Sequence, residues 1–483
     1  MKNTRQQLRW ISTMGLAGAS AALVLATVLV LAVITTPAAQ AQTFSVLYDF
    51  DNFEPDGFRS YAGLVQGIDG TLYGTTWVGG ANDYGSVFKI TPSGTLTTLH
   101  SFDNTDGANP DATLMQAANG DFYGTTPGGG ANGEGTVFKI TPSGTFTTLY
   151  NFCSQTNCTD GESPSAGLVQ ATNGELYGTT RFGGAYDCGT VFNINAAGTL
   201  TTLHSFDNTD GYTPAGTLIQ ATNGDLYGTT VSSGAYGDGT VFKMTPSGTL
   251  TTLHSFGYTD GANPVAGVIQ ATNFYGTTAG GGGSGDGTVF KMTPSGTLTT
   301  LHSFDNTDGA NPHAGLVQAT DGNFYGTTEL GGANTSGTIF KITAGGTLTT
   351  LYSFCPKSGC PDGAEPYAGL VQATNGTFYG TTYQGASADC FDGCGDVFSL
   401  SVGLGPFVET QTTSGKVGAA VKILGTNLTG ATSVTFNGTA ATFTVVSKSE
   451  ITTTVPTGAT TGPVEVTVSG HTLKSNTKFR VTP

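Results

Sequence analysis

The sequence predicts an all-β protein, a seven-bladed β-propeller closed by an N-terminal strand and followed by a small immunoglobulin-like β-sandwich. Tyr-Gly-Thr-Thr occurs seven times, at spacings of 50, 54, 50, 48, 50 and 54 residues. Each repeat holds four segments rich in Thr, Val, Phe and Tyr, without a sustained 3.6-residue apolar period. Repeats of this length form solenoids or propellers, in which each unit buries its apolar surface against its neighbours. The seven copies begin at Tyr73, Tyr123, Tyr177, Tyr227, Tyr275, Tyr325 and Tyr379.

Residues 1–41 predict an export signal. Three basic residues precede an apolar run from Met14 to Ile34, and Ala39-Gln-Ala41 offers a small-residue cleavage pattern. Cleavage after Ala41 would release a secreted or cell-surface protein. The run is also long enough to cross a bilayer, so an uncleaved N-terminal anchor is the alternative, and only then is the membrane a partner.

Two hairpins account for the four strands of each repeat. The first turns at an Asn-Gly pair such as Asn173-Gly174, in which both residues tolerate positive φ. The second turns at a Pro-Ser-Gly segment such as 142–144, where proline presets φ and glycine takes the strained position. Four strands in about 50 residues match the size of one propeller blade.

The ends of the repeat region favour a closed ring over an open stack. The seventh repeat ends after Asp396–Leu400 without a fourth strand, whereas Thr43–Phe50 matches the fourth-strand segment Thr95–Phe102 and stands before the first repeat. A ring closes by pairing its first strand into its last blade, which removes exposed sheet edges. We therefore expect the propeller to span residues 43–402.

The loops of this ring segregate by length, and long loops on a rigid scaffold are where function usually resides. The tight turns lie on one face. The Gly-rich loops, such as 77–85, and the interblade loops, such as 103–110, lie on the other, which we call the long-loop face. The repeats hold 30 of the 33 acidic and 8 of the 17 basic residues, and 23 of those 30 carboxylates fall on the long-loop face. Such a surface repels phosphate backbones, so we expect no nucleic-acid partner, while solvation of an extracellular monomer is the simpler reason for the charge.

An aspartate precedes glycine in every interblade loop. A structural turn explains this, because the side chain accepts hydrogen bonds from the backbone just ahead of it and the glycine takes positive φ. Calcium binding is the alternative, although the loops lack the carboxylate spacing of an EF-hand, and we expect no other cofactor or metal. The positions are Asp56, Asp106, Asp160, Asp210, Asp260, Asp308 and Asp362.

All seven cysteines fall in long loops of the third and seventh repeats. Disulfides within or between neighbouring loops explain this clustering better than zinc, because no histidine stands beside the Cys-x4-Cys pairs and an exported chain meets oxidising conditions. An odd number leaves one free thiol, most simply Cys188. The disulfide candidates are Cys153, Cys158, Cys355, Cys360, Cys390 and Cys394.

No arrangement of nucleophile, base and orienting group is visible in the repeats. The fourth-strand segments, which we expect at the outer rim of the ring, hold either histidine or tyrosine at one repeated position. His313 instead lies in an interblade loop and has no histidine at the equivalent position of another repeat. The repeated tyrosines of Tyr-Gly-Thr-Thr are expected to pack between blades. Aromatic residues that differ between blades are the better contact sites for a glycan or a protein: Trp77, Tyr84, Phe182, Tyr186, Tyr212, Tyr258, Tyr367 and Tyr383.

Residues 406–483 lose the repeat and alternate as short strands, including 420–425, 433–437, 450–455 and 462–468. This size suits a small sandwich. The segment resembles an IPT/TIG domain, an immunoglobulin-like module, through Gly425-Thr-Asn-Leu428, Val434-Thr-Phe-Asn-Gly438, Ile451–Pro456 and Phe479-Arg-Val481. The resemblance implies a spacer or protein-contact module.

The repeats themselves resemble the GloVer-type tandem repeat family of "choice-of-anchor" proteins, through Tyr-Gly-Thr-Thr with Gly-Gly-Ala and Gly-Thr-Val-Phe. The resemblance covers residues 43 to about 400 and implies an exported bacterial protein without an established activity. We therefore expect a non-enzymatic binding or scaffold protein that presents an acidic long-loop face to a glycan or an extracellular protein. A polysaccharide lyase or glycosidase acting at the propeller axis is the alternative.

Overall fold

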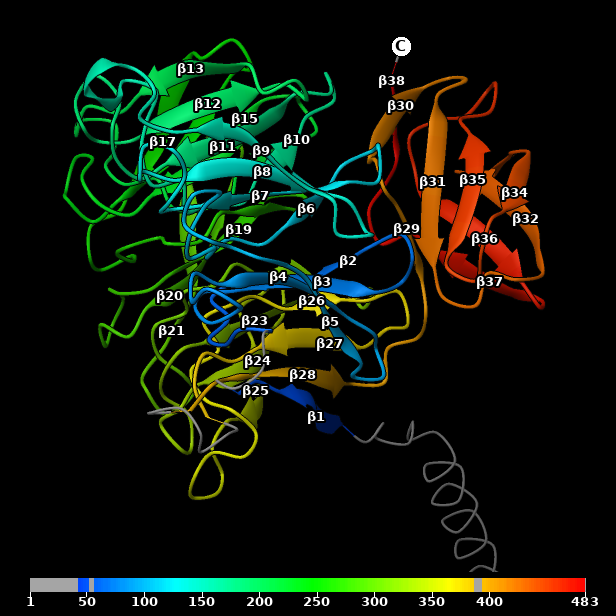
Figure 1. Ribbon diagram of the computed structural model, residues 1–483. Coiled ribbons are helices and arrows are strands. Elements are labelled where there is room, and N and C mark those ends of the chain that lie inside the picture. Colours follow the sequence, from blue (N-terminus) through cyan, green and yellow to red (C-terminus); the bar gives the residue numbers. More distant parts are fainter. Residues whose placement is uncertain (1–41, 52–55, 386–392, 483) are drawn as a thin grey trace, which may run out of the picture. The chain divides into compact units, whose positions relative to one another are not determined.

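The computed structural model describes residues 42–51, 56–385 and 393–482, and it folds the repeats into seven four-stranded antiparallel sheets (Figure 1). In each of the first six, the strands follow one another in chain order from the inner to the outer edge. The bounds are β2 (Val65–Gln66), β3 (Leu72–Thr76), β4 (Ser86–Ile90) and β5 (Leu96–Ser101); β6 (Met115–Gln116), β7 (Phe122–Thr126), β8 (Thr136–Ile140) and β9 (Phe146–Asn151); β10 (Val169–Gln170), β11 (Leu176–Thr180), β12 (Thr190–Ile194) and β13 (Leu200–Ser205); β14 (Ile219–Gln220), β15 (Leu226–Thr230), β16 (Thr240–Met244) and β17 (Leu250–Ser255); β18 (Ile269–Gln270), β19 (Phe274–Thr278), β20 (Thr288–Met292) and β21 (Leu298–Ser303); β22 (Val317–Gln318), β23 (Phe324–Thr328), β24 (Thr338–Ile342) and β25 (Leu348–Ser353).

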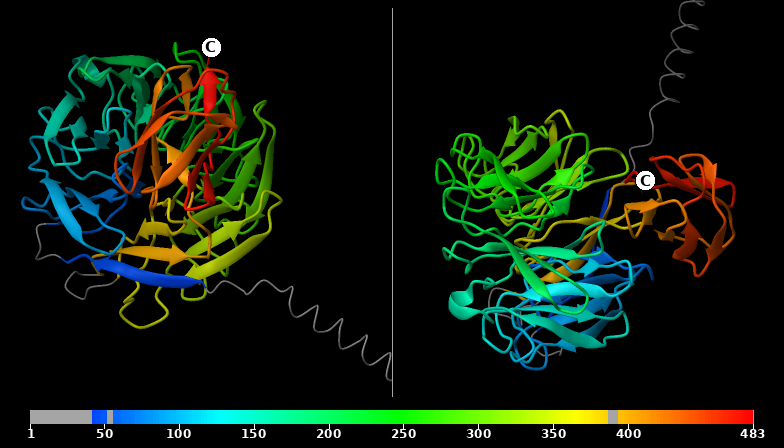
Figure 2. Two further views of the ribbon diagram at one scale, coloured as in Figure 1. Left: turned by 90° about the vertical axis from the view of Figure 1, so that its right-hand side faces the viewer. Right: turned by 90° about the horizontal axis from the view of Figure 1, so that it is seen from above.

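The seventh blade is built from both ends of the repeat region, as the sequence predicts. Its strands are β26 (Val371–Gln372), β27 (Phe378–Thr381), β28 (Asp396–Ser401) and, at the outer edge, β1 (Thr43–Asp49). The Phe44 ring stacks on Tyr352 of the sixth blade with centroids 4.0 Å apart. The left view of Figure 2 shows β1, in blue, beside the yellow and orange strands of this blade.

Repeated hydrogen bonds join each blade to the next and also cross the seam. The Gln66 side chain accepts a 2.9 Å bond from the Thr374 amide, and the Thr381 hydroxyl donates to the Ala62 carbonyl at 3.1 Å. The glutamine contact recurs between consecutive blades at Gln116, Gln170, Gln220, Gln270 and Gln372. Because the contact from the seventh blade to the first has the same form, the ring is closed and has no free sheet edge at the seam.

The apolar core lies between the blades. All seven tyrosines of Tyr-Gly-Thr-Thr are buried, with 0% to 4% of their surface exposed, which confirms their predicted packing role. Tyr227 stacks on Phe274 of the next blade at 4.2 Å, for example, while its hydroxyl accepts from Asn223 in the first turn. At the seam, Phe50, directly after β1, packs into one cluster with Leu72 and Phe88 of the first blade.

The innermost strands are shorter than the sequence suggests, with only two paired residues each. Close approach at the axis explains this, since the chain before each inner strand lies against the equivalent chain of neighbouring blades. A Cβ placed on Gly63 would lie 3.0 Å from the Thr113 hydroxyl and 3.3 Å from the Gly369 carbonyl oxygen. Glycine here lets the blades meet.

Residues 408–482 form two four-stranded sheets and a parallel pair, β30 (Ser414–Lys416) with β38 (Arg480–Thr482). One sheet has the order β29-β31-β35-β34, the other β33-β32-β36-β37. Val421 and Ile423 of the first sheet share a buried core with Phe436 and Val466 of the second. The remaining bounds are β29 (Val408–Thr410), β31 (Ala420–Gly425), β32 (Ala431–Phe436), β33 (Thr439–Ala440), β34 (Phe443–Val445), β35 (Glu450–Thr454), β36 (Val464–Val468) and β37 (His471–Lys474).

The predicted signal segment, residues 1–41, lies outside the described residues. Among the residues that are described, no helix has the length and apolar character needed to cross a bilayer.

Candidate functional site

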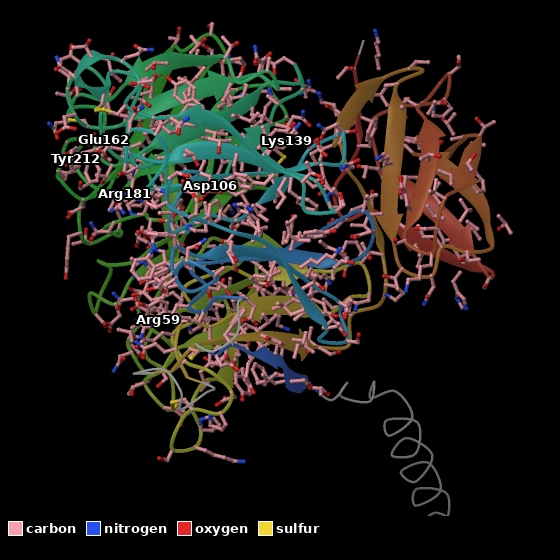
Figure 3. The ribbon with its side chains drawn as sticks, in the orientation of Figure 1. Arg59, Asp106, Lys139, Glu162, Arg181 and Tyr212 are labelled. Carbon is pink, nitrogen blue, oxygen red and sulfur yellow. A yellow bond between two sulfur atoms is a disulfide. The ribbon has the colours of Figure 1, made fainter. Side chains whose placement is uncertain are left out.

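Both long loops of every blade lie at the same end of the ring. In each blade the interblade loop pairs with the Gly-rich loop that follows the second strand of that blade. Examples are the bridges between Phe58 and Val78 and between Tyr212 and Ser232. Figure 3 shows Arg59, Arg181 and Tyr212 at this end, and Lys139 of β8 toward the other. The long-loop face is therefore a continuous set of paired loops.

The repeated aspartate of each interblade loop accepts a hydrogen bond from a side chain of the outermost strand, the rim strand, and we call this contact the rim clasp. Asp106 accepts from His100 Nε2 at 2.8 Å and from the Asp103 amide at 3.0 Å, three residues before it. Where the rim residue is tyrosine, its hydroxyl makes the same contact, at 2.7 Å between Tyr150 and Asp160. The other pairs are His204 with Asp210, His254 with Asp260, His302 with Asp308, Tyr352 with Asp362 and Tyr48 with Asp56.

This clasp explains why histidine and tyrosine alternate at the rim, because both can donate to a carboxylate. The glycine after each aspartate has positive φ, from 81° to 145°. The structural turn thus accounts for the repeated Asp-Gly without a bound ion.

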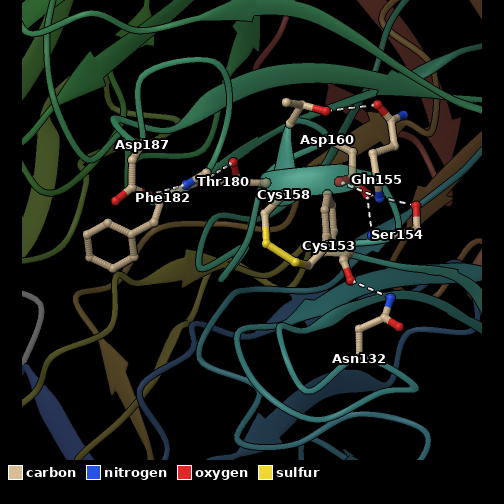
Figure 4. Close-up of a disulfide and its surroundings, with 12 residues drawn as sticks. Asn132, Cys153, Ser154, Gln155, Cys158, Asp160, Thr180, Phe182 and Asp187 are labelled. Carbon is tan, nitrogen blue, oxygen red and sulfur yellow. Dashed lines mark hydrogen bonds between the residues drawn. A yellow bond between two sulfur atoms is a disulfide. The ribbon is translucent and has the colours of Figure 1, made fainter.

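Two predicted disulfides stand within single interblade loops, Cys153–Cys158 and Cys355–Cys360. Figure 4 shows the first, next to Asp160, which accepts from the backbone amides of Ser154 and Gln155. Cys394 is also in a disulfide, and the remaining candidate, Cys390, lies outside the described residues. Cys188 is the free thiol and is buried, as predicted.

A metal at the cysteines is disfavoured. Among the described residues, the one group of three or more potential ligands is Cys153, Cys158 and Glu162, and its two sulfurs are joined to each other. Sulfurs in a disulfide are not thiolates, which are the species that bind zinc.

The eight predicted contact residues divide into two groups. Tyr84, Tyr186 and Tyr258 are exposed, at 36%, 64% and 56%. Trp77, Phe182, Tyr212, Tyr367 and Tyr383 are half-buried. The sequence analysis missed Tyr236, which is 72% exposed and occupies the place in the fourth blade that Tyr186 occupies in the third.

Three of the half-buried residues each contact Tyr61, and the four side chains form what we call the axial aromatic cluster: Tyr61, Trp77, Tyr367 and Tyr383. The Tyr61 ring lies 5.3 Å from Trp77, 4.9 Å from Tyr367 and 4.5 Å from Tyr383, measured between centroids. Tyr61 and Tyr367 precede the glycines that meet at the axis by two residues, so the cluster belongs to the axial end of the long loops. The Arg59 guanidinium lies 5.3 Å from the Tyr383 ring centroid.

A backbone turn common to all blades presents these positions. The residue two before the Tyr61 position has a left-handed conformation in every blade, with φ between 52° and 58°. Asparagine tolerates this conformation better than arginine or glutamate does. The turn residues are Arg59, Asn109, Ser163, Thr213, Asn263, Asn311 and Glu365.

Glu329 extends the axial aromatic cluster into the sixth blade. Its carboxylate accepts from the Tyr367 hydroxyl at 2.7 Å and lies 2.9 Å from His313 Nε2. Burial alone would raise the pKa of Glu329, but the contacts with His313 and Tyr367 outweigh it, and the pKa falls below its usual value. The same contact and burial raise the pKa of Tyr367.

The rest of the axial end is chemically different. Asp111 is half-buried, and burial raises its pKa to about 7 against the opposing effects of Ser165 and Arg181. In the fourth and fifth blades the same positions hold small residues, Ala215 and Val265. The aromatic side chains at these positions therefore gather on the sixth, seventh and first blades, whereas the second and third blades carry the charged residues Asp111 and Arg181.

The sequence analysis assigned no role to His313 and did not single out Glu329. An alignment of the repeats on Tyr-Gly-Thr-Thr could have identified both residues. Two positions in it vary strongly between blades: the residue just after Tyr-Gly-Thr-Thr and the residue just after the interblade proline. The aligned sets are Trp77, Pro127, Arg181, Val231, Ala279, Glu329, Tyr383 and Tyr61, Asp111, Ser165, Ala215, Val265, His313, Tyr367.

These features define a β-propeller whose variable side chains lie on the long-loop face. A family model described as the Gloeobacter/Verrucomicrobia repeat matches residues 32–223, 152–319, 217–398 and 271–449, and the chain belongs to this family. No curated protein matches the chain.

Solved structures share the fold at low sequence identity. A fungal alcohol oxidase of the AA5 family, in complex with copper, is 14% identical with a TM-score of 0.53, covering 92% of this chain and 100% of that one. The extracellular domain of a proposed hybrid two component system from B. thetaiotaomicron is 11% identical with a TM-score of 0.50, covering 80% of this chain and 45% of that one. At these identities the likeness concerns the fold alone.

Proposed function

We propose that this protein is an exported, non-enzymatic binding or scaffold protein whose long-loop face contacts a glycan or an extracellular protein. One observation carries the proposal. Every large apolar side chain that is exposed in the described part of the propeller lies in a long loop: Tyr84, Tyr186, Tyr236, Tyr258 and Leu330. Aromatic residues that are exposed on one face only are typical of contact surfaces.

The carboxylates around these side chains narrow the choice of partner. Glu162, Asp187 and the other loop carboxylates make the face acidic, and mutual repulsion from Glu134 and Asp187 adds to burial in raising the pKa of Glu162. Neutral or cationic partners suit such a surface, and polyanions do not. Because nucleic acids are polyanions, we propose that they are not partners of this face.

A glycan array probed with the labelled full chain tests this proposal. We expect binding that is lost when Tyr186, Tyr236 and Tyr258 are changed together to serine. Phe146→Leu is the matched control, because it removes a rim aromatic and introduces the leucine that other blades hold there. Binding that survives the triple substitution would show that the exposed tyrosines are not the contact.

An enzymatic function, a polysaccharide lyase or glycosidase, is the second candidate, and the contacts of Glu329 with His313 and Tyr367 favour it. The raised pKa of Tyr367 and of Tyr61 counts against either as a base poised near neutral pH. Incubation of array-positive polysaccharides with the protein tests this candidate. We expect no shortened product, and released oligosaccharide that disappears in Glu329→Gln would establish catalysis.

We further propose that the chain is exported through residues 1–41 and that residues 406–483 are an IPT/TIG domain acting as a spacer. The disulfides support export, because such bonds persist in oxidising compartments. Sequencing the N-terminus of the protein isolated from its native host tests the first part. A mature chain starting near residue 42 is expected, and an intact Met1 would indicate an anchor.

A further inference from the structure

We propose that the axial aromatic cluster, together with Glu329, binds the pyranose units of a neutral polysaccharide. The inference rests on the proposed function and names the ligand class of one site within the long-loop face. It concerns Tyr61, Trp77, Tyr367 and Tyr383 with the carboxylate beside them.

The rings supply an apolar platform. Tyr61 meets Trp77 and Tyr367 edge to face, with interplanar angles of 88° and 71°. Each edge-to-face contact occupies one face of one ring, Tyr383 lies tilted by 34° against Tyr61, and the faces not used by these contacts belong to side chains that all retain partial exposure. The C–H face of a pyranose packs on such a ring because the positive edge of each C–H bond meets the negative π face.

Glu329 supplies the polar anchor. A carboxylate accepts about four hydrogen bonds, and His313 and Tyr367 account for one contact at each of its oxygens. The remaining acceptor positions suit sugar hydroxyl groups. Its side chain is 12% exposed, so a hydrogen bond to this carboxylate forms in a mostly buried environment, where it is stronger than in water. A few oriented polar groups among aromatic side chains are typical of small-ligand sites.

Charge decides between neutral and acidic sugars. The long-loop face carries most of the acidic residues of the ring, and Glu329 itself is ionised at neutral pH because its pKa is lowered. A polyuronate would bring further negative charge to this surface. A neutral chain avoids that repulsion and still offers hydroxyl donors.

The axial aromatic cluster is not repeated around the ring. The equivalent residues of the fourth and fifth blades, Ala215 with Val231 and Val265 with Ala279, carry no ring and no charge. Packing of the propeller therefore does not require aromatic residues at these positions. One site per chain is expected.

Tryptophan fluorescence offers a direct test, because the chain contains only two tryptophans and one of them, Trp77, lies in the cluster. In the full chain carrying Trp10→Phe, Trp77 is the sole reporter. We expect saturable changes in its emission with at least one of cellohexaose, maltohexaose, mannohexaose and chitohexaose, and no response to hexagalacturonate.

Substitutions taken from other blades then assign the contact. Tyr61→Val and Tyr383→Val, which introduce the residues of the fifth and fourth blades, should each weaken binding about tenfold, the equivalent of one lost ring contact. Glu329→Gln should weaken it severalfold. Phe146→Leu should leave it unchanged.

Three outcomes would overturn the inference: no saturable response to any of the neutral oligosaccharides, tighter binding of hexagalacturonate, or affinities unaffected by Tyr61→Val and Tyr383→Val. These results are distinct from failure of the proposed function. Array binding that depends on Tyr186, Tyr236 and Tyr258 while Trp77 stays silent would keep the contact face and remove the sugar site.

Discussion

Positions that recur in all seven blades and positions that change from blade to blade behave differently in this propeller. The recurring ones, such as Tyr227 and the His254–Asp260 pair, are buried or joined to a fixed partner. The changing ones, such as Tyr61 and Glu329, meet at the axial end of the long loops. The recurring residues therefore hold the ring together, and the changing residues can vary without loss of the fold.

The seventh blade lies between these two classes, because it has the common form but is assembled from both ends of the repeat region. Phe50, directly after β1, is fully buried, like Phe256 at the same place in the fourth blade. Asp396 departs from the pattern, since five of the other blades hold threonine and one holds serine at that position. Substitutions at these places measure how far the seam matches a complete blade.

The largest effect is expected for Phe50→Ala. Loss of a fully buried ring between blades should lower the free energy of unfolding by about 3 to 5 kcal/mol. Phe256→Ala is the matched control and should cost a similar amount. Chemical denaturation of both variants measures the comparison. A cost below about 1 kcal/mol for Phe50→Ala alone would mean that β1 does not complete the ring.

A smaller effect of opposite sign is expected for Asp396→Thr. Asp396 is fully buried, and within the described structure the Thr382 hydroxyl lies near its carboxylate without a hydrogen bond of regular geometry to either oxygen. Threonine would restore the hydroxyl pair seen between Thr230 and Thr240, at 2.8 Å, and should stabilise the fold by about 1 to 3 kcal/mol. Equilibrium unfolding at neutral pH gives the value, and a loss of stability would contradict the account.

The same residue predicts a pH dependence. Burial, with the nearby Asp49 and Asp362, raises the pKa of Asp396 well above its usual value. A carboxyl group with a raised folded-state pKa contributes its full stability below the unfolded-state pKa and loses it as pH rises. The advantage of Asp396→Thr should therefore grow between pH 4 and pH 7. Denaturation curves across this range check it, and a constant difference would argue against burial of the carboxyl group.

Removing the hydrogen bond of one rim clasp should lower the free energy of unfolding by less than the substitutions above change it. Asp260→Ala removes the acceptor of His254 and of the Gly257 amide, and we expect a loss of about 1 kcal/mol because the pair is partly exposed. His254→Tyr should cost under about 0.5 kcal/mol, since tyrosine fills this role in other blades. Thermal melts of the two variants compare them. Equal losses would show that histidine has a role beyond donating to the aspartate.

The smallest effect on stability is expected at the axial aromatic cluster. Tyr61→Val places the fifth-blade residue in the first blade and should change the free energy of unfolding by less than about 1 kcal/mol. The emission of Trp77, 5.3 Å away, should change because its neighbour is lost. A cooperative loss of folding would place Tyr61 among the residues that hold the ring.

Much of the fold could be read from the sequence because repetition supplies seven independent observations of each turn and strand. Asn173-Gly174 and its equivalents marked the first hairpin in most blades, and Thr43–Phe50 revealed the seam by matching Thr95–Phe102. The candidate site could be read only in part. Trp77, Tyr367 and Tyr383 stood out as aromatic, but the contacts of Tyr61 with Tyr367 and Tyr383 join residues over 300 positions apart.

The sequence by itself determined the number of blades, the order of strands and the long-loop face, because these depend on local turn chemistry and on a motif that recurs at a regular spacing. Only the tertiary structure decided which variable residues become neighbours. Closing the ring brings the first blade beside the seventh and the seventh beside the sixth, so Tyr61 meets Tyr383 and Tyr367 meets Glu329. No local pattern encodes these meetings, since they arise from geometry around the whole axis.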